Sequence, residues 1–177
     1  MIKFTELLRP EYIRQGLICS SKKRLFEIIT QIIAEQIQLE NAEQLCFDCL
    51  LSREKIGNSG LGNGIAMPKA RIPGGNVPLA VFIHLDSPVD YESADHRDVD
   101  LVLALLVPEK MCEQYMSVLP ELADNISDKT LCKQLRAAQS VEEIWHIFEN
   151  FDQQQEHETP LASLDEKNII DENHESV

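Results

Sequence analysis

Long apolar runs are absent from this sequence. No stretch of it approaches the roughly 18 consecutive apolar residues that a membrane-spanning helix needs. The N-terminal segment MIKFTELLRPEYIRQG also lacks the apolar core of a secretory signal peptide. We therefore expect a cytoplasmic protein without membrane insertion.

Basic residues are scarce relative to acidic ones. The 177 residues include 16 lysines and arginines against 30 aspartates and glutamates, a formal net charge of −14. Nucleic acids and anionic membranes are bound through clustered Lys and Arg, so we expect neither as a partner. Residues 151–177 hold eight acidic residues and one basic residue, Lys167. The sequence predicts a domain over residues 1–150, followed by an acidic, disordered tail over 151–177 that favours solubility.

Cysteines are few and odd in number, which argues against a disulfide framework. Cys46 and Cys49 have the C-x-x-C spacing, but no second pair of ligands follows at the spacing of a zinc site. The pair also lies inside a helical pattern, not at the start of a helix after a strand, as a thioredoxin-like site requires. We interpret these residues as structural thiols and expect no metal site and no cofactor.

The first half of the chain begins with two expected helices. Ser21 can cap a helix to about Gln36, in which apolar residues recur at helical spacing. A second helix is expected from Asn41 to about Leu51, with Gln44 placed for a capping box. Four glycines among residues 57–64 predict a loop over 52–64 with unusual backbone angles.

Strands and further helices are expected after this loop. Residues 65–67 predict a short strand, 77–85 alternate in the manner of a strand, and the apolar run 99–107 predicts a strand covered on both faces. Three helices are expected next, over 109–126 with a break at Pro120, over 128–137, and from Ser140 to Asn150. This order predicts an α/β fold with a mixed β-sheet sandwiched between helices.

Several motifs resemble those of a known family. Arg53–Gly57 (REKIG) and Gly62–Pro68 (GNGIAMP) are similar to the signature of phosphotransferase-system enzyme IIA domains of the mannitol/fructose type. The segments Val99–Pro108 and Asp128–Ser140 carry the same likeness, which covers about residues 5–148 and is greatest to nitrogen-regulatory enzyme IIA. The resemblance implies the mixed sheet flanked by helices that the pattern also predicts.

The resemblance also implies an activity and partners. In this family a histidine accepts a phosphoryl group from a histidine-containing phosphocarrier protein. In the nitrogen-regulatory branch, the phosphorylation state is read by protein partners such as potassium transporters and sensor kinases.

The sequence departs from the family at the phosphate acceptor. Family members continue the motif as Pro-His-Gly, whereas this chain reads Pro68-Lys69-Ala70, and a second family histidine matches Tyr115. Arg53 matches an arginine that supports the phosphate in the family. An imidazole titrates near about 6.5 and offers a lone pair at neutral pH, whereas an amine titrates near about 10.4 and is protonated. The resemblance therefore implies no catalytic residue here, and a degenerate phosphocarrier that regulates through protein–protein interaction.

Two other functions remain open from the sequence. His96, in a polar loop, is the alternative acceptor if the protein is an active phosphocarrier. In the other reading, the protein senses an anion or a metabolite, in a pocket built from the cations and the glycine loop: Arg53, Ser59, Gly60, Gly62 and Lys69. His84, within a strand, is expected to be a packing residue.

Overall fold

The computed structural model describes the backbone of residues 2–37 and 40–171, and side chains as far as His157. Its helices are α1 (Phe4–Leu7), α2 (Lys22–Ala34), α3 (Ala42–Ile56), α4 (Cys112–Tyr115), α5 (Leu119–Ile126), α6 (Lys129–Ala137) and α7 (Val141–Asp171), with 3-10 turns η1 (Pro10–Tyr12) and η2 (Glu109–Met111). Its strands are β1 (Ile13–Leu17), β2 (Gly60–Gly62), β3 (Ile65–Ala66), β4 (Lys69–Ile72), β5 (Leu79–Val89) and β6 (Val99–Pro108). Within these described residues, none of the helices combines the length and the apolar character of a membrane span.

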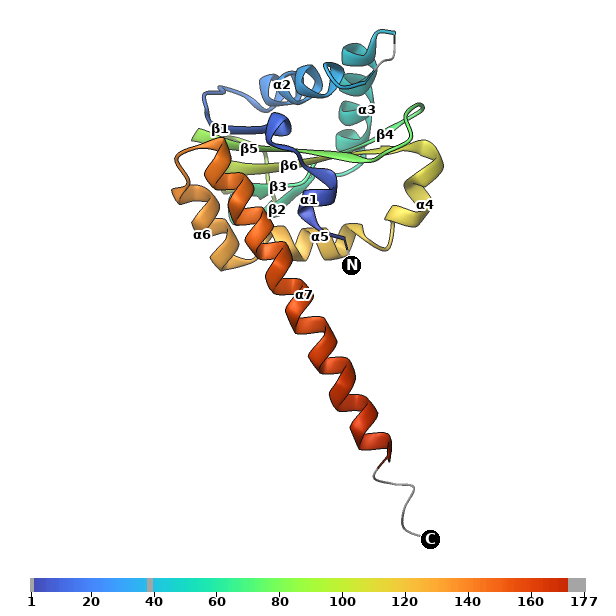
Figure 1. Ribbon diagram of the computed structural model, residues 1–177. Helices are drawn as coiled ribbons and strands as arrows, with labels where there is room; N and C mark the ends of the chain where they lie inside the picture. The colour runs from blue at the N-terminus through green and yellow to red at the C-terminus, as the bar shows by residue number, and fades with distance from the viewer. Residues whose placement is uncertain (1, 38–39, 172–177) are drawn as a thin grey trace.

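The six strands form one mixed sheet, as the sequence predicts. Its order is β1-β5-β6-β3-β2, and β4 also pairs with β6 (Figure 1). Strands β5 and β6 are antiparallel, whereas β1 runs parallel to β5, and both β3 and β4 run parallel to β6. The apolar strand β6 therefore lies inside the sheet, paired along both of its edges.

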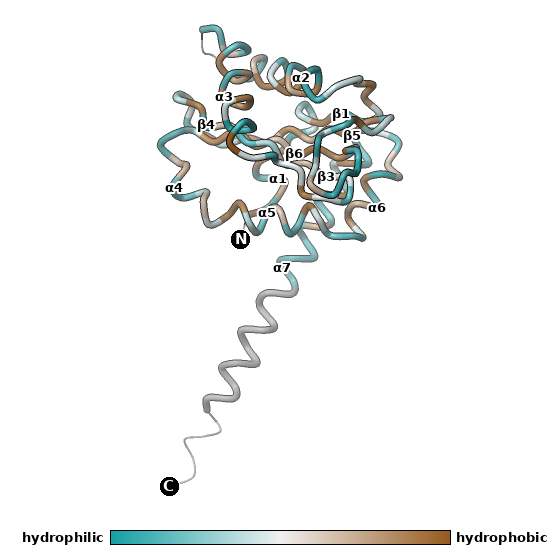
Figure 2. Tube along the Cα trace, turned by 180° about the vertical axis from the view of Figure 1, so that it is seen from behind, coloured by the Kyte–Doolittle hydropathy of each residue, from teal (hydrophilic) through white to brown (hydrophobic). Residues whose placement is uncertain are grey.

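Helices cover both faces of this sheet. Helices α2 and α3 lie on one face, and α1, α5, α6 and α7 lie on the other (Figure 1). Figure 2 shows the chain from behind, with the strands between the two helical layers. The alternation expected for β5 is confirmed, because Val81 and Ile83 pack under α2 and α3 whereas Ala80 and Phe82 face the other layer.

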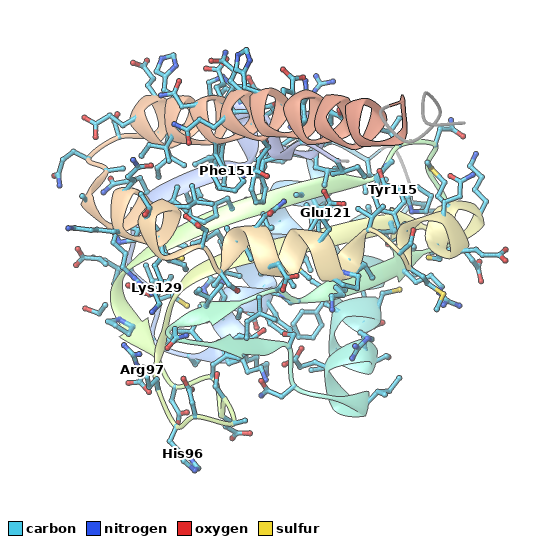
Figure 3. The ribbon with its side chains drawn as sticks, turned by 90° about the horizontal axis from the view of Figure 1, so that it is seen from below. His96, Arg97, Tyr115, Glu121, Lys129 and Phe151 are labelled. Carbon is cyan, nitrogen blue, oxygen red and sulfur yellow. The ribbon has the colours of Figure 1, made fainter. Side chains whose placement is uncertain are left out.

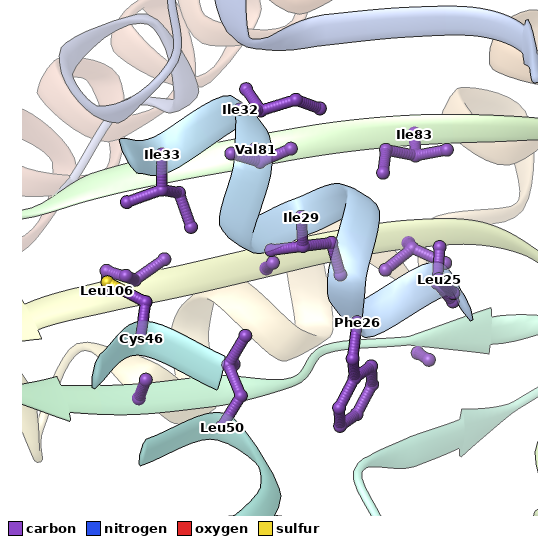
Figure 4. Close-up of a cluster of buried hydrophobic side chains, with 14 of the residues drawn as sticks. Leu25, Phe26, Ile29, Ile32, Ile33, Cys46, Leu50, Val81, Ile83 and Leu106 are labelled. Carbon is purple, nitrogen blue, oxygen red and sulfur yellow. The ribbon is translucent and has the colours of Figure 1, made fainter. Parts of the chain in front are cut away.

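Figure 4 shows the first of these two cores. Leu25, Ile29 and Ile33 of α2 are fully buried and lie over the sheet in the same cluster as Val81, Ile83 and Leu106. These residues belong to the apolar pattern at helical spacing, so the pattern identified the buried face of α2. Burial of each such side chain stabilises the fold by about 1.5–3 kcal/mol.

The expected helix starts are present where a side chain caps the helix. Ser21 Oγ accepts a hydrogen bond from Arg24 N (3.1 Å), and Asp128 Oδ2 accepts one from Leu131 N (2.9 Å). Ser140 Oγ likewise accepts from Glu143 N (3.1 Å). The expected split between 109 and 126 is confirmed too, since η2, α4 and α5 replace one long helix and a proline lies in the first turn of α5.

Helix α3 differs from its prediction at both ends. Asn41 precedes it in the left-handed region (φ 56°) without a side-chain cap, so the expected capping box is wrong. The helix also continues past Leu51 to Ile56, so the predicted loop begins only at Gly57. Arg53 and Lys55 lie in the last turn, where positive charge is favourable at the C-terminal end of the helix dipole.

Helix α7 does not end near Asn150. It continues to Asp171, so the prediction of a disordered tail is wrong for residues 151–171, and the remainder, 172–177, lies outside the described residues. The buried Asp152 explains why the helix passes the expected boundary. Its Oδ1 accepts from Phe4 N (3.0 Å), and its Oδ2 accepts from Thr5 N (2.9 Å) and Thr5 Oγ1 (2.9 Å). An acidic residue assigned to the tail thus holds α1 against α7.

Candidate functional site

The candidate site begins at an interruption of the edge of the sheet. Pro68 separates β3 from β4, and both short strands pair with β6. The carbonyl of Pro68 accepts from Leu105 N (2.9 Å), and Lys69 lies opposite Leu105 in the ladder. This arrangement fixes Lys69 as the first residue of β4, half-buried beside the end of α3.

A pocket of about 530 Å³ opens at this point between α3, β4, the end of β6 and the segment from α4 to α5. Three cations line it, Arg53 from α3 and Lys69 and Arg71 from β4, together with the carboxylate of Asp48. Arg53 and Lys69, which the sequence assigns to one binding site, both line this pocket. Arg71 was missed, although its position two residues after Lys69 in a strand was the signal, since alternate residues of a strand share a face.

The rest of the pocket is mostly apolar. Val107, Tyr115 and Leu119 line it on the side of β6, α4 and α5. At the rim stand Ile56 and Met116, whose exposed fractions of 83% and 70% are high for side chains of this size and type. Of this group, the sequence indicated only Tyr115, through the family resemblance. The apolar spacing around it is typical of core residues, so its neighbours were not assigned to a site.

Lys69 lies in an unfavourable place for a cation. Burial, and then the positive charge of Arg53, lower the pKa of the Lys69 amine from its ordinary value of 10.5, while Glu54 acts in the opposite direction. In the described part of the chain no carboxylate forms an ion pair with Lys69. Arg53 Nη1 donates to Gly57 O (3.2 Å), which holds the guanidinium at the end of α3.

Tyr115 remains a neutral phenol at physiological pH. Burial, and to a lesser degree the nearby Glu6, raise the pKa of Tyr115 above its ordinary value of 10.0. Figure 3 places Tyr115 at the α4 end of the helical layer that contains α5. Lys69 and Tyr115, the two positions that the resemblance equates with family histidines, thus line the same pocket.

The glycine loop does not line this pocket. Ser59, Gly60 and Gly62 are outside the lining of the pocket, which corrects the expected binding set. Ser59 N donates to Glu54 Oε1 (3.0 Å), and its hydroxyl pairs with Tyr91 OH (2.7 Å). A carboxylate and a buried phenol therefore already hold the beginning of this loop.

Two further amides of the loop also donate to side chains. Gly60 N donates to Asn58 Oδ1 (2.8 Å), and Asn63 N donates to Asp95 Oδ2 (2.9 Å). A Cβ added to Gly62 would lie 3.4 Å from Asp95 Oδ2, so a negative charge already stands beside this turn. The loop offers poor anion binding because three of its amides already donate to Glu54, Asn58 and Asp95, two of which are carboxylates.

A bidentate ion pair ties the end of this loop to the fold. Arg136 of α6 donates to both carboxylate oxygens of Asp100, with Nε–Oδ2 and Nη2–Oδ1 distances of 2.9 Å. Its Nη2 also donates to Asn63 O (2.8 Å). Asp100 and Arg136 belong to segments that carry the family likeness, but the sequence did not indicate that they pair.

With this geometry described, the chain can be compared with known proteins. The family model for the phosphoenolpyruvate-dependent sugar phosphotransferase system, EIIA 2, matches residues 6–151. The chain belongs to this enzyme IIA family. It is 56% identical over 154 residues to the nitrogen regulatory protein homolog of Haemophilus influenzae, covering 86% of this chain and 94% of the relative. It is 38% identical over 148 residues to the nitrogen regulatory protein of Escherichia coli K12, covering 83% and 90%.

Solved structures agree with the sequence relatives. The crystal structure of the nitrogen regulatory protein IIA-Ntr from Neisseria meningitidis superposes with a TM-score of 0.74 and 34% identity, covering 81% of this chain and 97% of that one. The mannitol IIA of Escherichia coli, at 19% identity and a TM-score of 0.65, shares the fold, with coverage of 80% and 98%. The predicted family, its fold and the likeness to nitrogen-regulatory members are thereby confirmed.

The alternative acceptor lies elsewhere on this enzyme IIA domain. His96 is exposed, has a left-handed backbone (φ 60°) and does not line the pocket. Figure 3 shows it at the tip of a loop, on the opposite side of the view from Tyr115. His84 is partly buried, and its Nδ1 accepts from Gly16 N (3.2 Å), which links β5 to β1.

The C-x-x-C cysteines of the domain are unsuited to thiolate chemistry. Cys46 is buried in the core under α2, and burial raises the pKa of its thiol to about 11. Cys49 is half-buried and lines the pocket, and burial raises its thiol pKa as well. Since a thiolate is the reactive form, both residues act as apolar side chains at neutral pH.

Proposed function

We propose that this enzyme IIA domain is a regulator that recognises protein partners without accepting a phosphoryl group. The observation that carries the proposal is the half-buried Lys69 amine in a pocket shared with Arg53 and Tyr115. The resemblance equates the Lys69 position with the phosphate acceptor of the family, and the Tyr115 position with its second histidine.

The chemistry of these two side chains supports the proposal. A phosphoryl acceptor needs a lone pair, and an ammonium group has none. An ordinary pKa of 10.5 leaves a lysine overwhelmingly charged at neutral pH; burial and then Arg53 lower the pKa of Lys69 from that value, and Glu54 opposes the shift. Tyr115 cannot take over the task, because its raised pKa keeps the phenol protonated. The charge of Lys69 is also opposite to that of a phosphohistidine, so any signal from this site corresponds to an unphosphorylated domain.

The rim of the pocket has the properties of a protein-binding surface. Ile56 and Met116 expose apolar side chains next to Arg53 and Arg71, and interfaces are enriched in arginine, methionine and large apolar groups. The mannitol enzyme IIA of Escherichia coli has been solved in a complex with phosphorylated enzyme IIB, so this fold can seat a protein partner. We expect the partner to present apolar and acidic groups; a phosphocarrier protein, a potassium transporter or a sensor kinase are the candidates that the family suggests.

Phosphotransfer tests the first half of the proposal. The wild-type chain and a Lys69→His, Tyr115→His double variant are incubated with a phosphorylated histidine-containing phosphocarrier, and the acid-labile label is followed. We expect label on the double variant alone, because it regains two imidazoles within an intact pocket. A stable acid-labile label on the wild-type chain would refute the proposal.

Docking tests the second half. Ile56 and Ile18 are both 83% exposed, but only Ile56 lines the pocket, so they form a matched pair. Ile56→Asp should weaken binding of the phosphocarrier, measured by titration, by about tenfold or more, a loss of about 1.4 kcal/mol. Ile18→Asp should leave the affinity unchanged. Equal effects of the two substitutions would place the interface elsewhere.

A further inference from the structure

We infer that the pocket beside Lys69 also binds a small amphipathic anion, a molecule with a carboxylate or phosphate head and an apolar tail of a few carbons. This inference goes beyond the proposed function, because it concerns the isolated chain and needs no protein partner.

The first observation is an unbalanced charge. Two other partly buried cations have a carboxylate partner: Lys22 Nζ lies 2.8 Å from Glu54 Oε1, and Arg136 pairs with Asp100, whereas a third, Arg14, donates to the carbonyls of Glu11 and Ile13. Lys69 is half-buried without such a partner in the described part of the chain. A cation removed from water is costly unless it is paired, so Lys69 is poised to receive an anion.

The second observation is the charge around Lys69. Arg53 and Arg71 line the same pocket, and a guanidinium presents donors in a geometry that fits carboxylate and phosphate oxygens. Of the acidic groups nearby, Glu54 pairs with Lys22, whereas Asp48 lines the pocket and keeps its negative charge, since its Oδ1 accepts only from the neutral amide of Gln44 (2.9 Å). In a chain of net charge −14, this pocket therefore has a net positive charge, from three cations and one carboxylate.

The third observation is that the pocket is too large and too apolar for an inorganic anion. Its volume of about 530 Å³ falls within the roughly 300–1,000 Å³ typical of small-molecule sites. Val107, Leu119 and Met116 line the part contributed by β6 and the α4–α5 segment. An inorganic phosphate would leave these side chains against water, whereas an alkyl tail would cover them, and each methylene buried raises affinity by about threefold to fourfold.

Titration of the full-length chain with four probes tests the inference. The probes are hexanoate, hexyl phosphate, inorganic phosphate and 1-hexanol, followed by calorimetry. We expect at least one hexyl anion to bind about tenfold or more tightly than both inorganic phosphate and 1-hexanol, because only the hexyl anions have a charged head and a tail. The ratio between hexanoate and hexyl phosphate then identifies the preferred head.

A matched pair of lysine variants locates the site. Lys69→Met keeps the length of the side chain but removes the charge, and should weaken binding of the hexyl anion about tenfold. Lys110→Met removes an exposed lysine outside the pocket and should leave binding unchanged. Circular dichroism checks that both variants are folded. Lys69→Arg retains the charge and should retain binding, and it serves as the second comparison if Lys69→Met folds poorly.

Three outcomes would overturn the inference. They are the absence of binding by either hexyl anion, binding of inorganic phosphate or 1-hexanol as tight as that of the hexyl anions, and an equal loss in Lys69→Met and Lys110→Met. None of them bears on phosphotransfer to the wild-type chain, so failure here is distinct from failure of the proposed function.

Discussion

At the scale of the residue, Lys69 couples the site to the stability of the fold. Its pKa in the folded chain is lowered by burial and by Arg53, so the unfolded chain, with an ordinary value of 10.5, binds the proton more tightly. Stability must then rise with pH between the lowered value and 10.5, where the unfolded state carries more protons. The protonated amine thus destabilises the folded chain at neutral pH.

Lys69→Met should therefore raise the melting temperature modestly at pH 7. The difference from wild type should shrink as the pH rises through the lowered pKa toward 10.5, because the wild-type amine then becomes neutral. Thermal unfolding across this pH range measures the difference, and Lys110→Met, at an exposed position outside the pocket, serves as the control. A difference that stays constant with pH would show that only the added apolar surface of Met matters.

Prediction from the sequence succeeded for some site residues and failed for others. Arg53 and Lys69 were identified because motifs place them, and the fold brings α3 and β4 together. Ser59 and Gly60 were assigned to the same pocket because glycine loops often bind anions. Their amides instead donate to Glu54 and Asn58, and no local pattern distinguishes a loop held by its own side chains from one open to a ligand.

At the scale of the element, α7 shows how one buried polar residue joins two helices that are distant in sequence. Asp152 is 6% exposed and accepts three hydrogen bonds from Phe4 and Thr5 at the start of α1. Loss of these charge-assisted bonds would leave two backbone N–H groups near α7 without their acceptor.

Asp152→Ala should therefore lower the free energy of unfolding by about 3 kcal/mol. Asp124→Ala, at an exposed position of α5, should change it by less than about 0.5 kcal/mol. Denaturant titration of both variants makes the comparison. Similar values for the two would contradict the role of Asp152 in joining α1 to α7.

Elements with local signals were predicted well. The caps Ser21 and Ser140, the alternation of β5 and the apolar run of β6 all report local geometry, and each matched the structure. The predicted ends of α3 and α7 were misplaced because contacts with other parts of the fold, which no local pattern reports, decide where these helices end. Phe151, for example, packs against Phe4 with its ring tilted and the ring centroids 5.6 Å apart, a contact between residues far apart in the sequence.

At the scale of the whole molecule, the fold followed from the order of the elements and from the motifs. The mixed sheet between two helical layers was predictable because β6 had to be covered on both faces. The contrast between an acidic chain and a cationic pocket was not predictable. It depends on Arg71 joining Arg53 and Lys69, while most acidic residues lie elsewhere.

The central claim is that this enzyme IIA domain binds protein partners but does not accept a phosphoryl group. The most direct measurement is the intact mass of the chain purified from its native host at alkaline pH, where a phosphoryl group on histidine survives. A Lys69→His, Tyr115→His variant purified in the same way is the positive control. The account predicts the unmodified mass for the wild-type chain; a covalently bound phosphoryl group on it would contradict the account.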